Sequence, residues 1–165
     1  MRNFKVFLWI FIIFLIQTVV LSRIHVFFAV PSAVMVYMVS VMMLENEFRR
    51  AAVIGIVCAV AMGALCGRDF VIVTLFYTYA ALVVFALRKK PAYVGFYPKT
   101  VMWSVLLSSV LEVIFILLET KTLNMQMLLM SVLPTAIFNA VLALIIYPIL
   151  KKTMYKEKKK KLLIV

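Results

Sequence analysis

The chain has 165 residues, 67% of them hydrophobic, and a mean hydropathy of +1.14. Soluble domains are only about half apolar, so this composition places the chain in a membrane. A bilayer core about 30 Å thick takes about 20 residues per helical crossing, which leaves no room for a soluble catalytic domain. The formal net charge of +12 would suit nucleic acid or an anionic membrane surface. In so apolar a chain we expect anionic lipid and no nucleic acid.

Charged residues divide the sequence into six apolar blocks, which predict an all-α bundle of six transmembrane helices in one domain, 1–165. We place the helices at about 4 to 21, 26 to 44, 51 to 67, 70 to 87, 100 to 118 and 127 to 150, followed by a basic tail over 151–165. The first block follows Arg2 and Lys5, as in a signal peptide. It is long for such a segment and no cleavage site follows, so we expect a retained helix.

Two local signals concern the ends of helices. Pro31 lies near the start of the second block, and the first turn of a helix is where its missing N–H costs least. Only Arg68 and Asp69 separate the third block from the fourth. We therefore expect a tight hairpin at the membrane surface there.

The third block carries small residues at every fourth position: Ala51, Gly55, Ala59, Gly63 and Gly67. On a helix these residues share one face, and small faces allow close backbone approach in membranes. Glycine and alanine are also simply frequent in membrane helices. We expect the face to pack, and this helix to be the one that the others pack against. The partner is either a neighbour in the same chain, which we favour, or another protein.

Lysine and arginine are distributed unevenly over the predicted loops. With six crossings, fifteen of the 18 fall on one side and three, Arg23, Arg68 and Lys121, on the other. Short loops rich in these residues stay in the cytoplasm, so both termini are expected there. The cations that we expect at the membrane surface are Arg88, Lys89 and Lys90 in the connection over 88–99 and Lys158, Lys159, Lys160 and Lys161 in the tail.

Glu112 lies well inside the fifth block, where a carboxylate costs about 2.5 to 3.5 kcal/mol even on the lenient insertion scale. Ser108 and Ser109 share its face of the helix. The carboxyl group is therefore either neutral and hydrogen-bonded inside the bundle, in contact with a partner's membrane helix, or part of a transport path.

The last block contains Pro134 and Asn139. Pro134 removes one helical hydrogen bond and bends the helix, and we expect Thr135 to bind the freed carbonyls. Asn139, near mid-membrane, needs a hydrogen-bond partner on another helix; such bonds average less than about 1 kcal/mol. A kinked packing helix is the interpretation we favour over a binding site.

Motifs of catalysis or cofactor binding are not found in the sequence: neither a phosphate-binding glycine loop, nor a zinc motif, nor a hydrolase nucleophile elbow. His25 is the one histidine, in a short outer loop. Cys58 and Cys66 lie in one apolar block and are expected to be buried apolar residues. We expect no enzyme activity, no cofactor and no metal.

The motifs in chain order resemble those of the rod-shape-determining MreD family. They begin with a Gly-x-x-x-small pair (Gly55 and Ala59) and a Leu-Glu pair (Leu111 and Glu112). The last helix has a Leu-Pro-Thr-Ala-x-x-Asn-Ala segment (Leu133 to Ala136, Asn139 and Ala140), a Tyr-Pro pair (Tyr147 and Pro148) and two lysines (Lys151 and Lys152). Family members often carry an acid where this chain has Gly63; its role is absent here or taken over by Asp69.

The resemblance implies a non-enzymatic subunit of the bacterial cell-elongation complex in the cytoplasmic (inner) membrane. Such a subunit would bind the scaffold MreC and, through it, the RodA glycosyltransferase, its transpeptidase partner and the MreB filament, in support of peptidoglycan synthesis and cell shape. The family is also similar in architecture to the substrate-binding subunits of energy-coupling-factor transporters. A vitamin-binding transporter subunit is therefore the alternative, although the very short outer loops offer few groups for a ligand site.

Overall fold

The computed structural model describes residues 2–23, 31–88, 96–120 and 125–162, and these residues form helices without any strand. The α-helices are α1 (Arg2–Leu15), α2 (Ala33–Leu44), α3 (Phe48–Cys66), α4 (Phe70–Leu87), α5 (Phe96–Thr120) and α6 (Met125–Leu162). α1 continues as a π-helical turn, Ile16–Val20, and a 3-10 turn, Leu21–Arg23. The protein is thus a helical bundle, as the apolar blocks predict.

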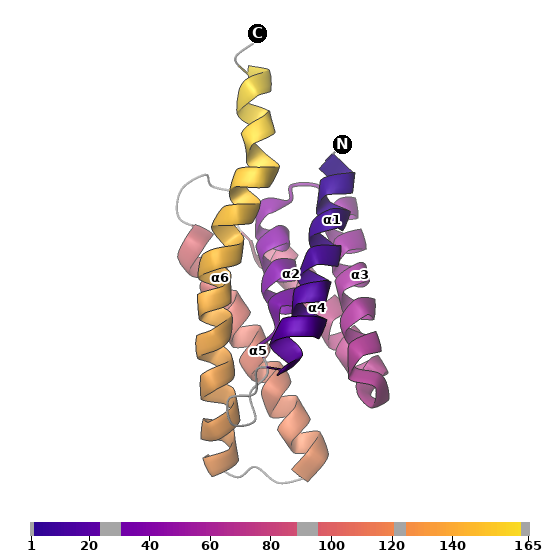
Figure 1. Ribbon diagram of the computed structural model, residues 1–165, viewed down its shortest axis with the longest axis vertical. Coiled ribbons are helices and arrows are strands. Elements are labelled where there is room, and N and C mark those ends of the chain that lie inside the picture. The colour runs from indigo at the N-terminus through magenta and orange to yellow at the C-terminus, as the bar shows by residue number, and fades with distance from the viewer. Residues whose placement is uncertain (1, 24–30, 89–95, 121–124, 163–165) are drawn as a thin grey trace.

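Successive helices run in opposite directions, and the first and last helices leave the bundle at the same end (Figure 1). Four apolar segments among the described residues are long enough to cross a membrane: α3, α4, Pro98–Leu118 of α5 and Leu128–Thr153 of α6. The apolar helices Val6–Val20 and α2 are shorter. The chain is therefore a membrane protein with at least four helices of spanning length.

The connection between α3 and α4 is as short as the sequence indicates. A single 3-10 turn, Gly67–Asp69, joins the two helices. α4 covers the same residues as the fourth apolar block, and α3 begins three residues before the third. The two helices consequently pack against each other along their length (Figure 1).

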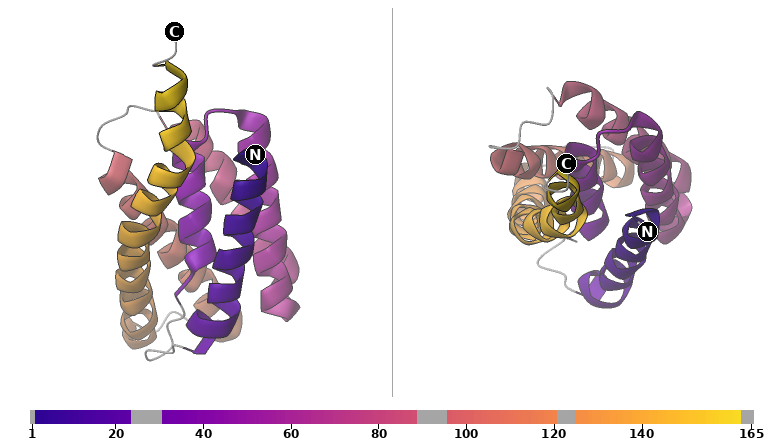
Figure 2. Two further views of the ribbon diagram at one scale, coloured as in Figure 1. Left: turned by 45° about the horizontal axis from the view of Figure 1, so that its top comes forward. Right: turned by 90° about the horizontal axis from the view of Figure 1, so that it is seen from above.

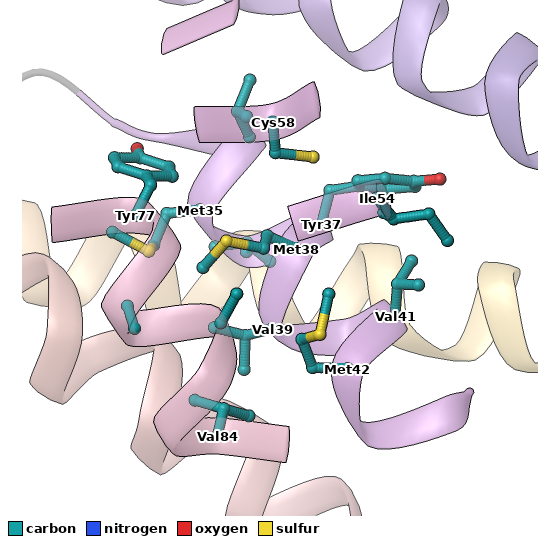
Figure 3. Close-up of a cluster of buried hydrophobic side chains, with 14 of the residues drawn as sticks. Met35, Tyr37, Met38, Val39, Val41, Met42, Ile54, Cys58, Tyr77 and Val84 are labelled. Atoms are coloured by element: carbon teal, nitrogen blue, oxygen red, sulfur yellow. The ribbon is translucent and has the colours of Figure 1, made fainter. Parts of the chain in front are cut away.

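The central helix is α2, not α3 as the sequence analysis expected. Every residue from Ala33 to Leu44 is buried, and α2 contacts each of the other five α-helices. Figure 3 shows its side chains meeting Ile54 and Cys58 of α3 and Val84 of α4. Seen from above, α2 lies between the α3–α4 pair and the α5–α6 pair (Figure 2).

The physical reason is that α2 is apolar all round its axis, which is typical of a helix enclosed by others. α3 instead exposes one side, including Val53, Ile56 and Val60. Its small residues mainly contact α4, and Gly55 also lies close to Met42 of α2.

α2 is also shorter than expected, because it begins at Ala33 with Ser32 as its N-cap. Pro31 therefore precedes the helix and does not lie in its first turn, which is a correction to the sequence analysis. The predicted start of this helix at about residue 26 falls outside the described residues. The consequence is a helix of 12 residues, about 18 Å long, that cannot cross the apolar layer alone.

α6 is longer than expected, since its 38 residues continue without a break through Pro134 and Pro148 to Leu162. Prolines are tolerated in membrane helices where neighbours satisfy the freed backbone groups. The residues 151–162, expected as a separate tail, extend α6 beyond the rest of the bundle (Figure 1).

Candidate functional site

The start of α2 is held by polar side chains from three other segments. The amide N–H of Ser32 donates to Oδ1 of Asn139 on α6 over 2.9 Å, and the hydroxyls of Ser32 and Tyr77 on α4 are 2.8 Å apart. The Ser32 hydroxyl also accepts from the N–H of Met35, as an N-cap does. One helix terminus thus joins α2, α4 and α6.

Gln17 completes this cluster from the π-helical turn. Its Nε2 donates to the carbonyl of Pro31 over 2.9 Å, and its Oε1 accepts from the N–H of Ala33 over 2.8 Å. The side chain is 5% exposed. A π-helical turn changes the direction of side chains and is frequent at functional sites. Here the turn carries the residue that binds the first N–H of α2 and the carbonyl of Pro31 just before the helix.

This α2 start cluster (Gln17, Ser32, Tyr77 and Asn139) lies deep in the apolar layer. Tyr77 is near the middle of α4, and Asn139 is near the middle of the apolar segment Leu128–Thr153 of α6. The first N–H groups of a helix carry a partial positive charge and need acceptors, which lipid does not provide. The cluster supplies those acceptors from side chains.

A second polar feature, the α5–α6 seam, runs along the contact between the last two helices. Its polar residues recur every fourth position on each helix: Ser104, Ser108 and Glu112 on α5 and Ser131, Thr135 and Asn139 on α6. The hydroxyl of Ser131 donates to Oε1 of Glu112. Because the helices are antiparallel, this register places Thr135 near Ser108 and Asn139 near Ser104.

Of the three interpretations left open for Glu112, this contact favours a hydrogen bond inside the bundle. Glu112 is half-buried and its oxygen is bound by the neighbouring helix of the same chain. Ser108, one turn earlier, donates to the carbonyl of Val105 and not to the carboxyl group. The carboxyl group therefore links α5 to α6 at one end of the seam.

Three polar atoms of the seam are buried without a hydrogen-bond partner: Oγ of Ser104, Oγ1 of Thr135 and Nδ2 of Asn139. The expectation that Thr135 binds a carbonyl freed by Pro134 is therefore wrong. Asn139 does find its expected partner on another helix, but only through its oxygen. Unpaired polar groups at such depth cost free energy, so the seam is less stable than a fully bonded one would be.

The small-residue row of α3 faces α4. A Cβ atom built on Gly55 would lie 2.8 Å from Cβ of Ala81, and one built on Gly63 would overlap Thr74 and come within 3.0 Å of the Phe70 carbonyl oxygen. Ala59 is fully buried, and its carbonyl accepts from Thr74 over 3.5 Å. The contact lies within the chain.

Gly67 does not belong to this row, which corrects its assignment as a packing residue. It lies at the C-cap of α3 with a φ of 56°, and a Cβ atom there would meet nothing within 4 Å. A positive φ is the reason for glycine at this position. Gly67 ends α3 and opens the turn to α4.

Arg88 has a structural contact that the sequence analysis missed. At the C-cap of α4, its Nη1 donates to the carbonyl of Met42 over 2.7 Å and to the carbonyl of Glu45, so it binds the C-terminal end of α2. Cations stabilise such ends. Lys89 and Lys90 lie outside the described residues, and only the backbone is described at Lys158 to Lys161.

The residues that could take part in metal or redox chemistry are few. Among the described residues, no three of His, Cys, Asp and Glu lie close enough together to hold a metal ion. Cys58 is buried and Cys66 half-buried, both as free thiols. His25 falls outside the described residues.

Gln17, Ser32 and Tyr77 were not singled out from the sequence, although two signals were available. A glutamine inside an apolar block must find a partner, and a serine directly before a helical block is a typical N-cap. Tyr77 carried no such signal, because a tyrosine in an apolar helix is ordinary.

Comparison of the chain with protein-family models, with curated proteins and with solved structures finds no match.

Proposed function

We propose that this protein is a non-enzymatic, multi-pass subunit of the bacterial cell-elongation complex in the cytoplasmic membrane, similar to MreD, and that it binds a scaffold similar to MreC. The proposal depends on where two residues of the MreD-like motifs, Glu112 and Asn139, lie in the bundle. Glu112 and Asn139 each bind another helix of the same chain, as expected for a subunit whose polar groups hold its own bundle together.

In this proposal the chain crosses the membrane six times and both termini are cytoplasmic. Arg2, Arg49, Arg50 and Arg88 belong to the end of the bundle where the chain begins, and Arg68 belongs to the opposite end (Figure 1). This distribution agrees with the bias of cytoplasmic loops toward lysine and arginine.

The topology predicts the behaviour of fused reporters. A reporter that is active only in the cytoplasm should be active when fused after Lys161 and inactive when inserted after Arg68. An insertion after Glu47, between α2 and α3, is the matched internal control and should be active. Activity after Arg68 would contradict the topology.

The energy-coupling-factor alternative has one observation in its favour, because polar groups converge at mid-membrane in the α2 start cluster. Those groups, however, bind one another and the backbone of α2. A ligand would have to replace these bonds with its own. We therefore prefer the scaffold-binding function.

Purification distinguishes the two functions. We expect the protein to co-purify with a co-expressed single-span partner similar to MreC and to bind no vitamin saturably. An unrelated single-span protein at equal level is the control, and denatured samples are analysed by mass spectrometry for retained small molecules. Retention of a vitamin without capture of the scaffold would overturn the proposal in favour of transport.

A further inference from the structure

An apolar groove lies between α3 and α4, next to Met42 of α2. It has a volume of about 100 Å³, and its lining presents almost no polar surface. The residues that form it include Met42, Gly55, Ala81, Phe48, Leu82 and Phe85. Sites that enclose a whole small ligand have volumes of about 300 to 1,000 Å³, so this groove can hold only part of a longer molecule.

The groove opens toward the lipid. Ile56 and Leu82, on its two sides, are exposed, while Ala51 and Ala81 beneath them are buried. The depth comes from Gly55, since any side chain there would approach Ala81 and Met42. In a membrane, the molecules next to such a surface are acyl chains.

Among the described residues, arginines lie at the end of this groove formed by Phe48 and Phe85. Arg88 lies with its Cζ 3.9 Å from the centre of the Phe85 ring, and its bonds to the α2 carbonyls hold it there. Phe85 in turn packs edge-on against Phe48, the first residue of α3. Arg49 follows Phe48 and shares a helix face with Ala52, which lines the groove.

The charges at this end do not cancel among the described residues. Arg50 pairs with Glu47 over 3.0 Å, and Glu45 lies beside Arg88 through its carbonyl group. Three arginines against two glutamates leave one positive charge, and Arg49 is the exposed member without an ion pair.

We propose that this groove binds one anionic phospholipid, with an acyl chain over Gly55 and Ala81 and the phosphate at Arg49 and Arg88. An apolar groove with net positive charge at one end matches a molecule with an apolar tail and an anionic head. A partner's membrane helix would match the apolar part without using the charge. The proposal is independent of the function proposed above.

The test uses the full-length protein in nanodiscs that contain phosphatidylcholine and phosphatidylglycerol, and it compares how much of each lipid the protein retains. Protein extracted in mild detergent is analysed by native mass spectrometry for bound lipid. We expect phosphatidylglycerol to be enriched over its share in the nanodisc. Ala52→Phe, which fills the groove, should abolish the enrichment, and Ala64→Phe, at an exposed position of α3 that does not line the groove, should preserve it.

Arg49→Gln tests the charge without disturbing α2. Since one cation near an anionic surface contributes about 1 kcal/mol, the preference for phosphatidylglycerol should fall about fivefold. Equal retention of both lipids by the wild-type protein would overturn the proposal. Unchanged phosphatidylglycerol enrichment in Ala52→Phe would also overturn it. If Ala52→Phe abolishes the capture of a single-span partner while lipid retention stays the same, the groove binds a partner's membrane helix instead.

Discussion

Replacing Gly63 with leucine is expected to lower the free energy of unfolding of the bundle by about 3 kcal/mol, the upper part of the usual range for overpacking. The first added carbon would already overlap the Thr74 hydroxyl and press on the Phe70 carbonyl oxygen. A backbone atom cannot rotate away, so α3 and α4 must separate and lose dispersion contacts along their length. A thermal melt of the purified protein in detergent measures the loss.

Two matched variants make this result specific. Gly63→Ala should also destabilise, although glycine to alanine inside a helix ordinarily stabilises by about 0.5 to 1 kcal/mol. Val60→Leu, on the exposed side of α3, should leave the melting temperature nearly unchanged. If Gly63→Leu melts like the wild type but no longer captures a scaffold protein, the small row would serve an external partner instead.

The elements that the sequence predicts well are those whose signal is local. Apolar length and a two-residue interruption are enough to define α4 and the hairpin before it, because both depend only on neighbouring residues. The central role of α2 was missed for the opposite reason. A helix that is apolar on every face has no stripe that shows which helices it contacts. The row of small residues on α3 is conspicuous, but it indicates close contact mainly with α4.

The polar sites are likewise predictable where their signal is local and unpredictable where it depends on distant residues. Glu112 and Asn139 are visible in the sequence, since each is a costly residue inside an apolar block. Their partners are not visible, because the choice of Ser131 and Ser32 depends on the register of helices that are distant along the chain. The late start of α2, at Ala33, was equally hidden. It creates backbone groups at mid-membrane that need partners, and this need explains why Gln17 and Asn139 converge on that point.

The convergence on the start of α2 predicts opposite effects for two neighbouring residues of α6. Asn139→Leu, similar in branching, removes the acceptor of the Ser32 N–H and leaves that donor unpaired deep in the bundle. Leaving a buried donor without an acceptor costs about 1 to 3 kcal/mol, which is more than the average stabilisation from an interhelical hydrogen bond in a membrane. We expect a clearly lower melting temperature in detergent, with faster amide exchange at the start of α2.

Thr135→Val, one turn earlier on the same face of α6, is the matched control. It keeps the branched shape but removes a buried hydroxyl that has no hydrogen-bond partner, so the melting temperature should stay the same or rise. The pair separates the hydrogen bond of Asn139 from the general cost of altering this face, because both substitutions replace a buried polar side chain with an apolar one. Equal destabilisation by the two variants would mean that close packing along the seam, rather than capping of α2, determines its stability.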